Sequence, residues 1–369
     1  MNPPHPVRIG CCITPHGFGH AARACAVLEA LAARLPIHCQ IVSTVPEWFF
    51  RQSLTAPFTL HPLLTDVGLA QHDSLREDID LTLARLDALY PLRPALLRQT
   101  AALLADCRLI LCDIAPLGIA AAELARKDLG STVQSVLLEN FTWDWIYQGY
   151  AEQRPALRRH IDCLRELFSR ADHHLQAEPV CAPSKADLRI PPIARSLRQE
   201  RKAVRKQLGL PETVKLVLVT MGGIAGTALP LKRMAAMAQD CSFLLAGQPV
   251  DALTGQGNLY FLPQNSGFWH PDLIAACDAV VGKIGYSTLA EAFQAGIPYG
   301  AVCRPRFRES EVLAAFAEQA MPALLISEEQ FQHSGWLNLL PELLALRPKN
   351  TPPENGAPAA AEFLRRLLL

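Results

Sequence analysis

The sequence predicts an α/β protein of two Rossmann-like, doubly wound domains, each built on a parallel sheet. Short apolar segments alternate with helical patterns in both halves of the 369-residue chain, as expected of parallel strands buried on both faces. A passage with four prolines, residues 179–192, lies between the halves and is typical of a domain linker. Each half also has a glycine-bearing loop after an apolar segment. Ligands bind open parallel sheets at such strand ends.

These signals predict an N-terminal domain of residues 1–180, a linker of 181–198, a second domain of 199–347, and a tail with a C-terminal helix at 348–369. In the first domain, strands are expected at 7–14, 37–43, 109–112 and 133–138. Helices are expected at 21–35, 116–127 and 155–171, and residues 66–106 are expected to be mostly helical. Residues 139–145 are predicted to be a loop.

In the second domain, apolar runs predict strands at residues 216–220, 243–246, 259–262, 279–281 and 299–302. Helices are expected at 199–208, 231–239 and 272–276, and a two-turn helix is expected to end at Gly296. Thr288 and Glu291 have the spacing of a capping box for that last helix. Glycines 282 and 285 precede it, so a turn leads from a strand into a helix N-terminus, which favours phosphate.

Composition excludes several classes of protein. Lys plus Arg and Asp plus Glu are equal at 35 each, which argues against non-specific nucleic-acid binding. No apolar run reaches the roughly 18 residues of a membrane span, and the N-terminus does not resemble a signal peptide. The 11 cysteines have no C-x-x-C spacing and are interpreted as reduced thiols of a cytoplasmic protein. The oligomeric state is left open.

The loop of the first half contains two candidate catalytic histidines, His16 and His20, around Gly17 and Gly19. It lacks the third glycine and the acidic residue of a dinucleotide-binding fingerprint. Histidine titrates near neutral pH, so His20 is the candidate general base and His16 a second candidate. Asp113 ends a predicted strand and could orient the imidazole. The alternative is that these side chains only cap helices or serve the loop.

The segment Gly285-x-x-Thr288-x-x-Glu291, followed by Gly296 and Pro298, resembles the C-terminal nucleotide-sugar site of GT-B glycosyltransferases. The resemblance implies two such domains whose sheets face each other across a cleft. It also implies that the helix N-terminus holds the donor diphosphate and that Glu291 binds ribose hydroxyls. The implied donor-binding residues are Gly222, Gly223, Gln264, Lys283, Gly285, Tyr286, Ser287, Thr288, Glu291, Arg304 and Glu309. Phe268 and Trp269 are either core residues or a stacking surface for the base.

Four motifs, HGFGHAAR, LLENFTWDWIY, RKAVRKQLGL and GKIGYSTLAEA, together resemble the glycosyltransferase-like N-terminal half of plant L-arabinokinases over about residues 7–345. The first domain would then bind the acceptor, with acceptor-side residues Gly17, Gly19, Arg23, Asn140, Trp143 and Asp144. Those kinases continue into a sugar-kinase domain that is not expected here, so kinase activity is not implied.

The resemblance implies transfer of a hexose or pentose from a nucleotide diphosphate, with UDP as the expected nucleotide, to an unidentified acceptor. Inversion is expected, without metal or cofactor, with His20 as base and Asp113 orienting it. The sequence Asp78-Ile-Asp80 has the D-x-D form of metal-dependent enzymes, but it lies in a charge-rich helical stretch and is not expected to bind metal.

The alternatives to a glycosyltransferase are a non-catalytic nucleotide-sugar sensor or partner subunit, and a nucleotide-sugar hydrolase or epimerase.

Overall fold

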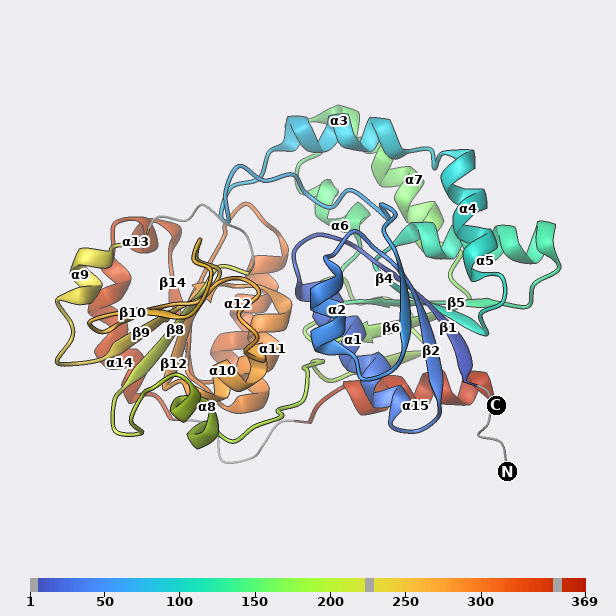
Figure 1. The fold of residues 1–369 in the computed structure, drawn as a ribbon. Coiled ribbons are helices and arrows are strands. Elements are labelled where there is room, and N and C mark those ends of the chain that lie inside the picture. Colours follow the sequence, from blue (N-terminus) through green and yellow to red (C-terminus); the bar gives the residue numbers. More distant parts are fainter. Residues whose placement is uncertain (1–5, 223–228, 348–353) are drawn as a thin grey trace, which may run out of the picture. The chain divides into compact units, whose positions relative to one another are not determined.

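The computed structural model describes residues 6–222, 229–347 and 354–369. The chain forms two compact units (Figure 1). The first unit comprises the described parts of Met1–Ala70, together with Glu77–Ala194 and Asn355–Leu369. The second comprises Gln71–Arg76 and the described parts of Arg195–Glu354. The C-terminal segment therefore belongs to the first unit, although it follows the second in sequence.

The first unit contains a parallel sheet of seven strands in the order β3-β2-β1-β4-β5-β6-β7. The strands are β1 Val7–Ile13, β2 Ile37–Val42, β3 Phe58–His61, β4 Leu109–Asp113, β5 Gln134–Glu139, β6 His173–Ala177 and β7 Leu188–Ile190. Strand order reverses between β1 and β4, which pair in register from Ile9 with Leu109 to Ile13 with Asp113. The loops after these two strands are consequently neighbours at the switch point of the sheet, the usual ligand position in such folds.

Helices of the first unit form two groups around this sheet. Both α1 and α5 contact β1 and β4; α1 also contacts α2 and α15, whereas α5 contacts α4 and α7. Their bounds are α1 Gly19–Ala32, α2 Glu47–Ser53, α3 Ile79–Leu89, α4 Pro94–Leu104, α5 Pro116–Leu129, α6 Trp143–Gln148, α7 Arg158–Ser169 and α15 Ala357–Leu368, with a 3-10 turn at Pro155–Leu157.

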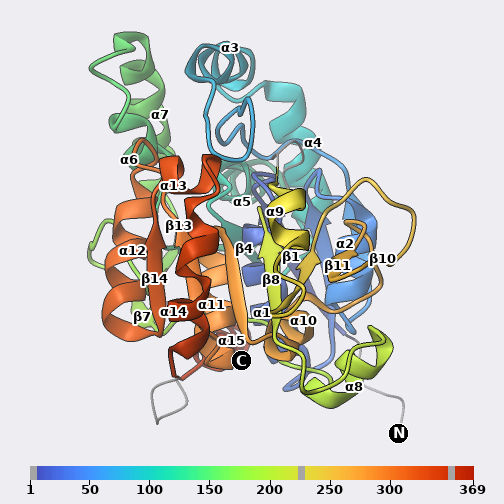
Figure 2. The same cartoon turned by 90° about the vertical axis from the view of Figure 1, so that its left-hand side faces the viewer.

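The second unit has a seven-stranded sheet in the order β10-β11-β9-β8-β12-β13-β14, parallel except for the edge pair β10 and β11 (Figure 2). The strands are β8 Leu216–Thr220, β9 Ser242–Leu245, β10 Thr254–Gln256, β11 Leu259–Phe261, β12 Ala279–Lys283, β13 Tyr299–Val302 and β14 Ala323–Ile326. Helices α10 His270–Ala276, α11 Tyr286–Ala295 and α12 Glu309–Ala320 lie on one side of it (Figure 1).

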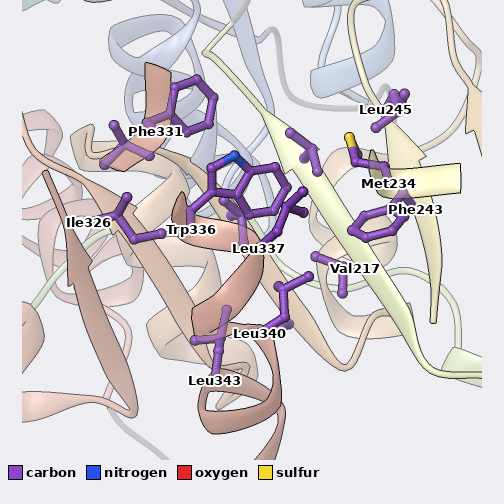
Figure 3. Packing of buried hydrophobic residues seen from close by; sticks show 14 of the residues in the cluster. Val217, Met234, Phe243, Leu245, Ile326, Phe331, Trp336, Leu337, Leu340 and Leu343 are labelled. Atoms are coloured by element: carbon purple, nitrogen blue, oxygen red, sulfur yellow. The ribbon is translucent and has the colours of Figure 1, made fainter. Parts of the chain in front are cut away.

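The other side of the second sheet carries α9 Leu231–Ala235, α13 Glu328–Gln332 and α14 Leu340–Ala345 (Figure 1). The helix α8 Arg201–Gln207 packs on α10, and a 3-10 turn spans Gly335–Leu339. Trp336, fully buried in this core, stacks on Phe331 with ring centroids 5.9 Å apart and meets the ring of Phe243 edge-on (Figure 3). Apolar residues of sheet and helices thus close into one continuous core.

The prediction of two doubly wound α/β halves is confirmed by these topologies. The prediction of a mostly helical stretch at 66–106 is wrong for its first part, because the chain there is irregular up to Asp78. The start of this irregular stretch is fixed by side-chain hydrogen bonds: Thr65 donates to the carbonyl of Ile13, and Thr14 donates to Asp66. The predicted loop at 139–145 is also partly wrong, because α6 begins at Trp143.

Candidate functional site

The start of α1, the end of β4 and the residue after β5 bring four polar side chains of the first unit together. Asp113, the last residue of β4, is fully buried, and His20 and Arg23 lie on the first two turns of α1 with 7% and 1% exposure. His20 Nδ1 lies 2.9 Å from Asp113 Oδ1. Arg23 donates to both carboxylate oxygens, over 2.8 Å and 2.6 Å, and its Nη1 donates to Asn140 Oδ1 over 2.6 Å.

The charge state of Asp113 decides which face of the imidazole is basic. Burial opposes ionisation of Asp113, but the charge and hydrogen bonds of Arg23, followed by those of His20, hold its pKa below the ordinary value. A carboxylate can only accept, so Nδ1 of His20 donates to it. The lone pair of the neutral ring is then on Nε2, which has no hydrogen bond within the described residues. The pair has the arrangement of a general base and its orienting acid.

His16 occupies a different environment in the same loop. Its Nδ1 accepts from the backbone N–H of Leu69 over 3.4 Å, and its ring meets Trp143 edge-on at 5.2 Å. Gly17, next to it, has φ of 70°, and Gly19 opens α1. The structure therefore brings His16 near Trp143, while the carboxylate of Asp113 is engaged by His20 and Arg23.

The predicted acceptor-side residues of the 139–145 segment gather at the start of α6. Trp143 is fully buried, and its ring contacts those of His16, His20, Phe141 and Tyr147. Burial raises the pKa of Asp144, whose carboxylate lies 3.7 Å from the Arg165 guanidinium. Trp143 thus packs against the rings of both histidines.

Sequence reasoning missed a second buried carboxyl group, Asp66. It accepts a hydrogen bond of 2.6 Å from Thr14 at the end of β1, and burial raises its pKa to about 7 despite that bond. Tyr147 donates to the carbonyl of Gly68 over 2.5 Å and fastens the same segment. The only sequence signal for this contact is that Asp66 follows a strand closely, because the fold alone brings it to Thr14.

The strand–turn–helix from β12 to α11 forms the predicted donor loop. A side chain at Gly282 would place its Cβ 1.9 Å from the carbonyl oxygen of Thr220, so only glycine fits between β12 and β8. Gly285 is the N-cap of α11, and no side chain caps the helix. The capping-box prediction is therefore wrong: Thr288 is already the third helical residue, and the Glu291 carboxylate binds elsewhere.

Glu291 is almost fully buried and has both carboxylate oxygens engaged. Arg195 Nε donates to Oε1, and Nδ1 of His270 lies on Oε2, each over 2.8 Å. Burial opposes ionisation, but Arg195 and then His270 hold the pKa of Glu291 below its ordinary value. Arg195 follows the proline-bearing passage and His270 opens α10, so no local pattern linked either residue to Glu291. Its ribose-binding role stays a prediction.

Trp269 packs within this arrangement rather than standing free. Its Nε1 donates to the carbonyl of Ser196 over 2.9 Å, and the guanidinium carbons of Arg195 and Arg198 lie 4.5 Å and 3.6 Å from its ring centre. Two cation–π contacts on one indole hold residues 195–198 against α10.

Lys283 ends β12 beside two other predicted donor residues, Arg304 and Glu309, all with less than a tenth of their surface exposed. Burial and the Arg304 charge lower the pKa of Lys283 to about 7, and Glu309 opposes the shift. Gly222, with φ of 71°, lies so close that a Cβ there would be 3.2 Å from Lys283 Cε. The structure thus brings these four residues together.

The remaining predicted donor residues are placed as follows. Tyr286 and Thr288 are buried on the first turn of α11, and Ser287 between them is half-buried. Gln264 is exposed in the connection between β11 and α10. Gly223 lies outside the described residues.

The two aspartates of the D-x-D sequence serve local structure. Asp78 is the N-cap of α3 and accepts from the N–H of Leu81 over 2.8 Å, and Asp80 pairs with Arg154 over 2.7 Å.

All 11 cysteines are free thiols, eight of them buried. Within the described ranges, no helix combines the length and apolar character that crossing a membrane requires.

No protein-family profile matches the chain. The chain is 28% identical to L-arabinokinase of Arabidopsis thaliana over 368 residues, which cover 96% of this chain and 34% of that protein. It thus spans about a third of the length of this relative.

A UDP-glucosyltransferase from Polygonum tinctorium, capable of glucosylating indoxyl, has a similar structure. The match covers 100% of this chain and 99% of that chain, with a TM-score of 0.59 and 13% identity. LpCGTa, solved with UDP, matches 98% of this chain and 94% of its own, with a TM-score of 0.57 and 16% identity. The predicted GT-B fold is confirmed.

Proposed function

We propose that this chain, which has the GT-B fold, is a glycosyltransferase that moves a hexose or pentose from a UDP-linked donor to a hydroxyl group of an acceptor. The proposal rests above all on the buried His20–Asp113 pair at the switch point of the first sheet. UDP is supported by solved structures of the same fold that are described with UDP or as UDP-dependent enzymes.

In the proposed reaction, Nε2 of His20 takes the proton from the acceptor hydroxyl as its oxygen bonds to the anomeric carbon. The bond from that carbon to the diphosphate oxygen breaks, and its electron pair leaves with the diphosphate. Asp113 holds the imidazole in the required tautomer, and Arg23 keeps Asp113 ionised and fixed. Attack opposite to the leaving group inverts the anomeric centre.

The second unit would bind the donor at the N-terminus of α11. Its first-turn N–H groups and the helix dipole favour the charge that develops on the departing diphosphate. Lys283, two residues before the N-cap of α11, and Arg304, whose charge acts on Lys283, would add positive charge to this donor site. We expect turnover without a divalent metal, because both aspartates of the D-x-D sequence are committed to α3 and to Arg154.

The test begins with a thermal-shift screen of UDP-, GDP-, ADP- and TDP-linked sugars, since a ligand that binds only the folded protein raises its Tm. The stabilising donor is then incubated with a panel of hydroxyl-bearing acceptors, with and without EDTA. We expect stabilisation by a UDP-sugar and EDTA-resistant formation of an inverted glycoside.

Three other results would overturn the proposal in distinct ways. Binding without turnover across the panel would indicate a nucleotide-sugar sensor. Release of free sugar or exchange of a sugar C–H proton with solvent would indicate a hydrolase or an epimerase. If no nucleotide sugar raised the Tm, the proposed donor site would be wrong.

A further inference from the structure

The amine of Lys283 is buried at the end of β12. Its residue is 9% exposed, and its Nζ has no hydrogen-bond or ion-pair partner among the residues that the structure describes. Buried amines are ordinarily paired, because an isolated charge in a protein interior is strongly disfavoured. An amine left in this state either stays neutral or awaits a ligand.

The surroundings of Nζ favour an anionic ligand over a structural role. Arg304 repels the charged amine, while Glu309 attracts it less strongly than burial and Arg304 oppose it. The third polar neighbour, the Tyr299 hydroxyl, donates to the backbone carbonyl of Lys283 and leaves the amine untouched. Two cations held close together with one carboxylate give this position a net positive charge when Lys283 is protonated.

Backbone geometry leaves room for a ligand at the same place. A Cβ built on Gly222 would lie 3.4 Å from Nζ, so the absent side chain there lets a ligand approach the amine. Two residues after Lys283, Gly285 is the N-cap of the ten-residue helix α11, which starts with no side-chain cap. The unpartnered amine and the uncapped helix are independent features, and both favour a phosphate-type anion.

From this geometry we infer that Lys283 is a ligand for the donor diphosphate and that its amine takes up a proton as the diphosphate binds. The inference rests on the proposed function, because it takes that donor site as its premise. The phosphate charge would outweigh the repulsion from Arg304 and restore the ammonium form. Donor affinity would then decrease as pH rises above neutrality, and release of the diphosphate would return the proton.

The number of protons taken up on UDP binding follows from the pKa of about 7 that Lys283 has in the empty site. At pH 8 about one tenth of the free amine carries a proton, whereas the ammonium form predominates in the complex, so binding takes up about 0.9 proton. The apparent affinity for UDP should fall by up to about tenfold per pH unit above 7. The terminal phosphate of UDP, with a second pKa of about 6, is already ionised and contributes little to this count.

The stability of the empty protein supplies a second signature. The folded-state pKa of Lys283 lies below its unfolded value, so between about pH 7 and 10 the unfolded state binds more protons. Lys283 therefore destabilises the fold most at and below pH 7, and less as pH rises. Lys283→Met, which removes the buried charge but fills similar space, should raise the Tm of the empty protein at pH 7 while it weakens UDP binding by about tenfold or more.

The experiment is isothermal titration calorimetry of the full chain with UDP at pH 8, in two buffers of different ionisation enthalpy. Wild-type protein should take up about 0.9 proton. Lys283→Arg, which keeps a permanent charge, should bind UDP with almost no proton uptake, and Lys283→Met should bind weakly without uptake. Lys202→Met is the matched control, because Lys202 is 81% exposed and should behave as wild type.

The titrations distinguish a failure of this inference from a failure of the proposed function. If UDP binds the wild-type protein but no proton is taken up, or if Lys283→Met takes up as many protons as wild type, the inference is wrong and the donor site stands. An unchanged UDP affinity in Lys283→Met would also overturn it. If UDP and UDP-sugars do not bind the wild-type protein, the proposed function fails, and the inference fails with it.

Discussion

At the residue scale, His20 and His16 differ in their partners although they lie four positions apart in one loop. Nδ1 of His20 donates to a buried carboxylate, whereas Nδ1 of His16 accepts from a backbone N–H. Acceptance at Nδ1 leaves Nε2 of His16 as the protonated nitrogen of the neutral ring. Only His20 therefore presents a basic Nε2 that is held in place by an acid.

We expect His20→Ala to keep UDP binding and to lower the transfer rate by roughly 10²–10⁴-fold, the usual contribution of a general base. Asp113→Asn should lower it less than His20→Ala, and His16→Ala least, because Nδ1 of His16 accepts from a backbone N–H where Nδ1 of His20 bonds to a buried carboxylate. Single-turnover rates and UDP affinity measured on the same preparations separate chemistry from binding.

Asp113 is also part of the buried cluster with Arg23, so its replacement affects folding. Circular dichroism and Tm must accompany the kinetics of Asp113→Asn, since breaking a buried charge pair is costly. Transfer at the parent rate by a folded His20→Ala protein would show that another group is the base.

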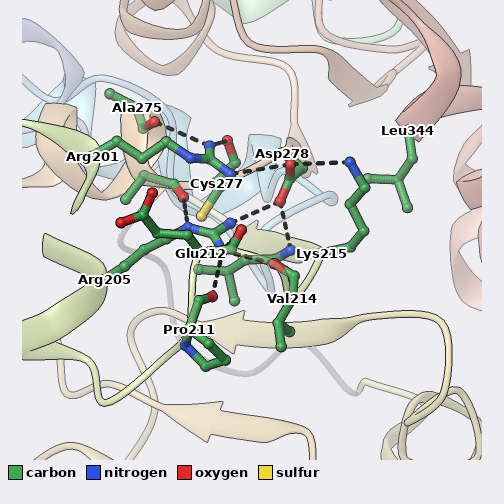
Figure 4. A network of polar contacts seen from close by, with 12 residues as sticks. Arg201, Arg205, Pro211, Glu212, Val214, Lys215, Ala275, Cys277, Asp278 and Leu344 are labelled. Atoms are coloured by element: carbon green, nitrogen blue, oxygen red, sulfur yellow. Dashed lines mark hydrogen bonds and ion pairs between the residues drawn. The ribbon is translucent and has the colours of Figure 1, made fainter.

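At the element scale, charged side chains of the second unit cluster at the N-terminal ends of β8 and β12. Arg205 of α8 is fully buried and donates to the carbonyls of Ala276 and Val214 and to Asp278, over 2.7–2.8 Å (Figure 4). Arg201 donates to the carbonyl of Cys277 over 2.6 Å. These bonds satisfy the carbonyls that α10 leaves unpaired at its end and join α8, α10 and both strands.

Replacing Arg205 with Met should destabilise the second unit by about 3–5 kcal/mol, because several buried carbonyls and Asp278 lose their donor at once. Lys202→Ala, on the same helix but exposed, is the control and should change stability by at most about 0.5 kcal/mol. Hydrogen exchange of the β8 and β12 amides measures the effect within this unit. Equal protection in the two variants would mean that α8 is not needed to hold these strands.

At the scale of the whole molecule, the alternation of apolar runs and helices was sufficient to predict both sheets, because parallel strands buried on two faces leave a strong pattern. The bounds of β8 and β13 were predicted to the residue. Short or amphipathic elements were missed, among them α2 and α12, since seven residues or a charged first turn carry little periodic signal. Contacts between distant residues could not be predicted.

The candidate sites show the same limit. Asp113 and His20 could be proposed as partners because each lies at a strand end of the same half. Arg195 and His270 could not be linked to Glu291, since 96 and 21 residues separate them from it and only the fold brings them together. The capping-box prediction failed because the helix starts earlier: Gly285 is its N-cap, so Thr288 is already inside the first turn.

The helix α15 belongs to the first unit, although it follows the second unit in sequence. After the second unit, the chain returns to the first, where α15 contacts α1 (Figure 1). Asn355 fixes the return by bonding both backbone groups of Ala194, over 2.8 Å and 3.3 Å. Leu364 of α15 is fully buried. The last helix is therefore part of the core that holds α1, and α1 carries His20.

We expect Leu364→Ala to destabilise the first unit by about 2–5 kcal/mol, the usual range for a buried leucine. Hydrogen exchange should show lost protection in α1 but unchanged protection in β12 and β13, because α15 belongs to the first unit only. Arg366→Ala, on the exposed face of the same helix, is the control and should leave both units as they are. Loss of protection in β12 with α1 unaffected would contradict the assignment. A parallel loss of transfer, without a change in UDP affinity, would show that α15 supports His20, the proposed base, from a distant part of the sequence.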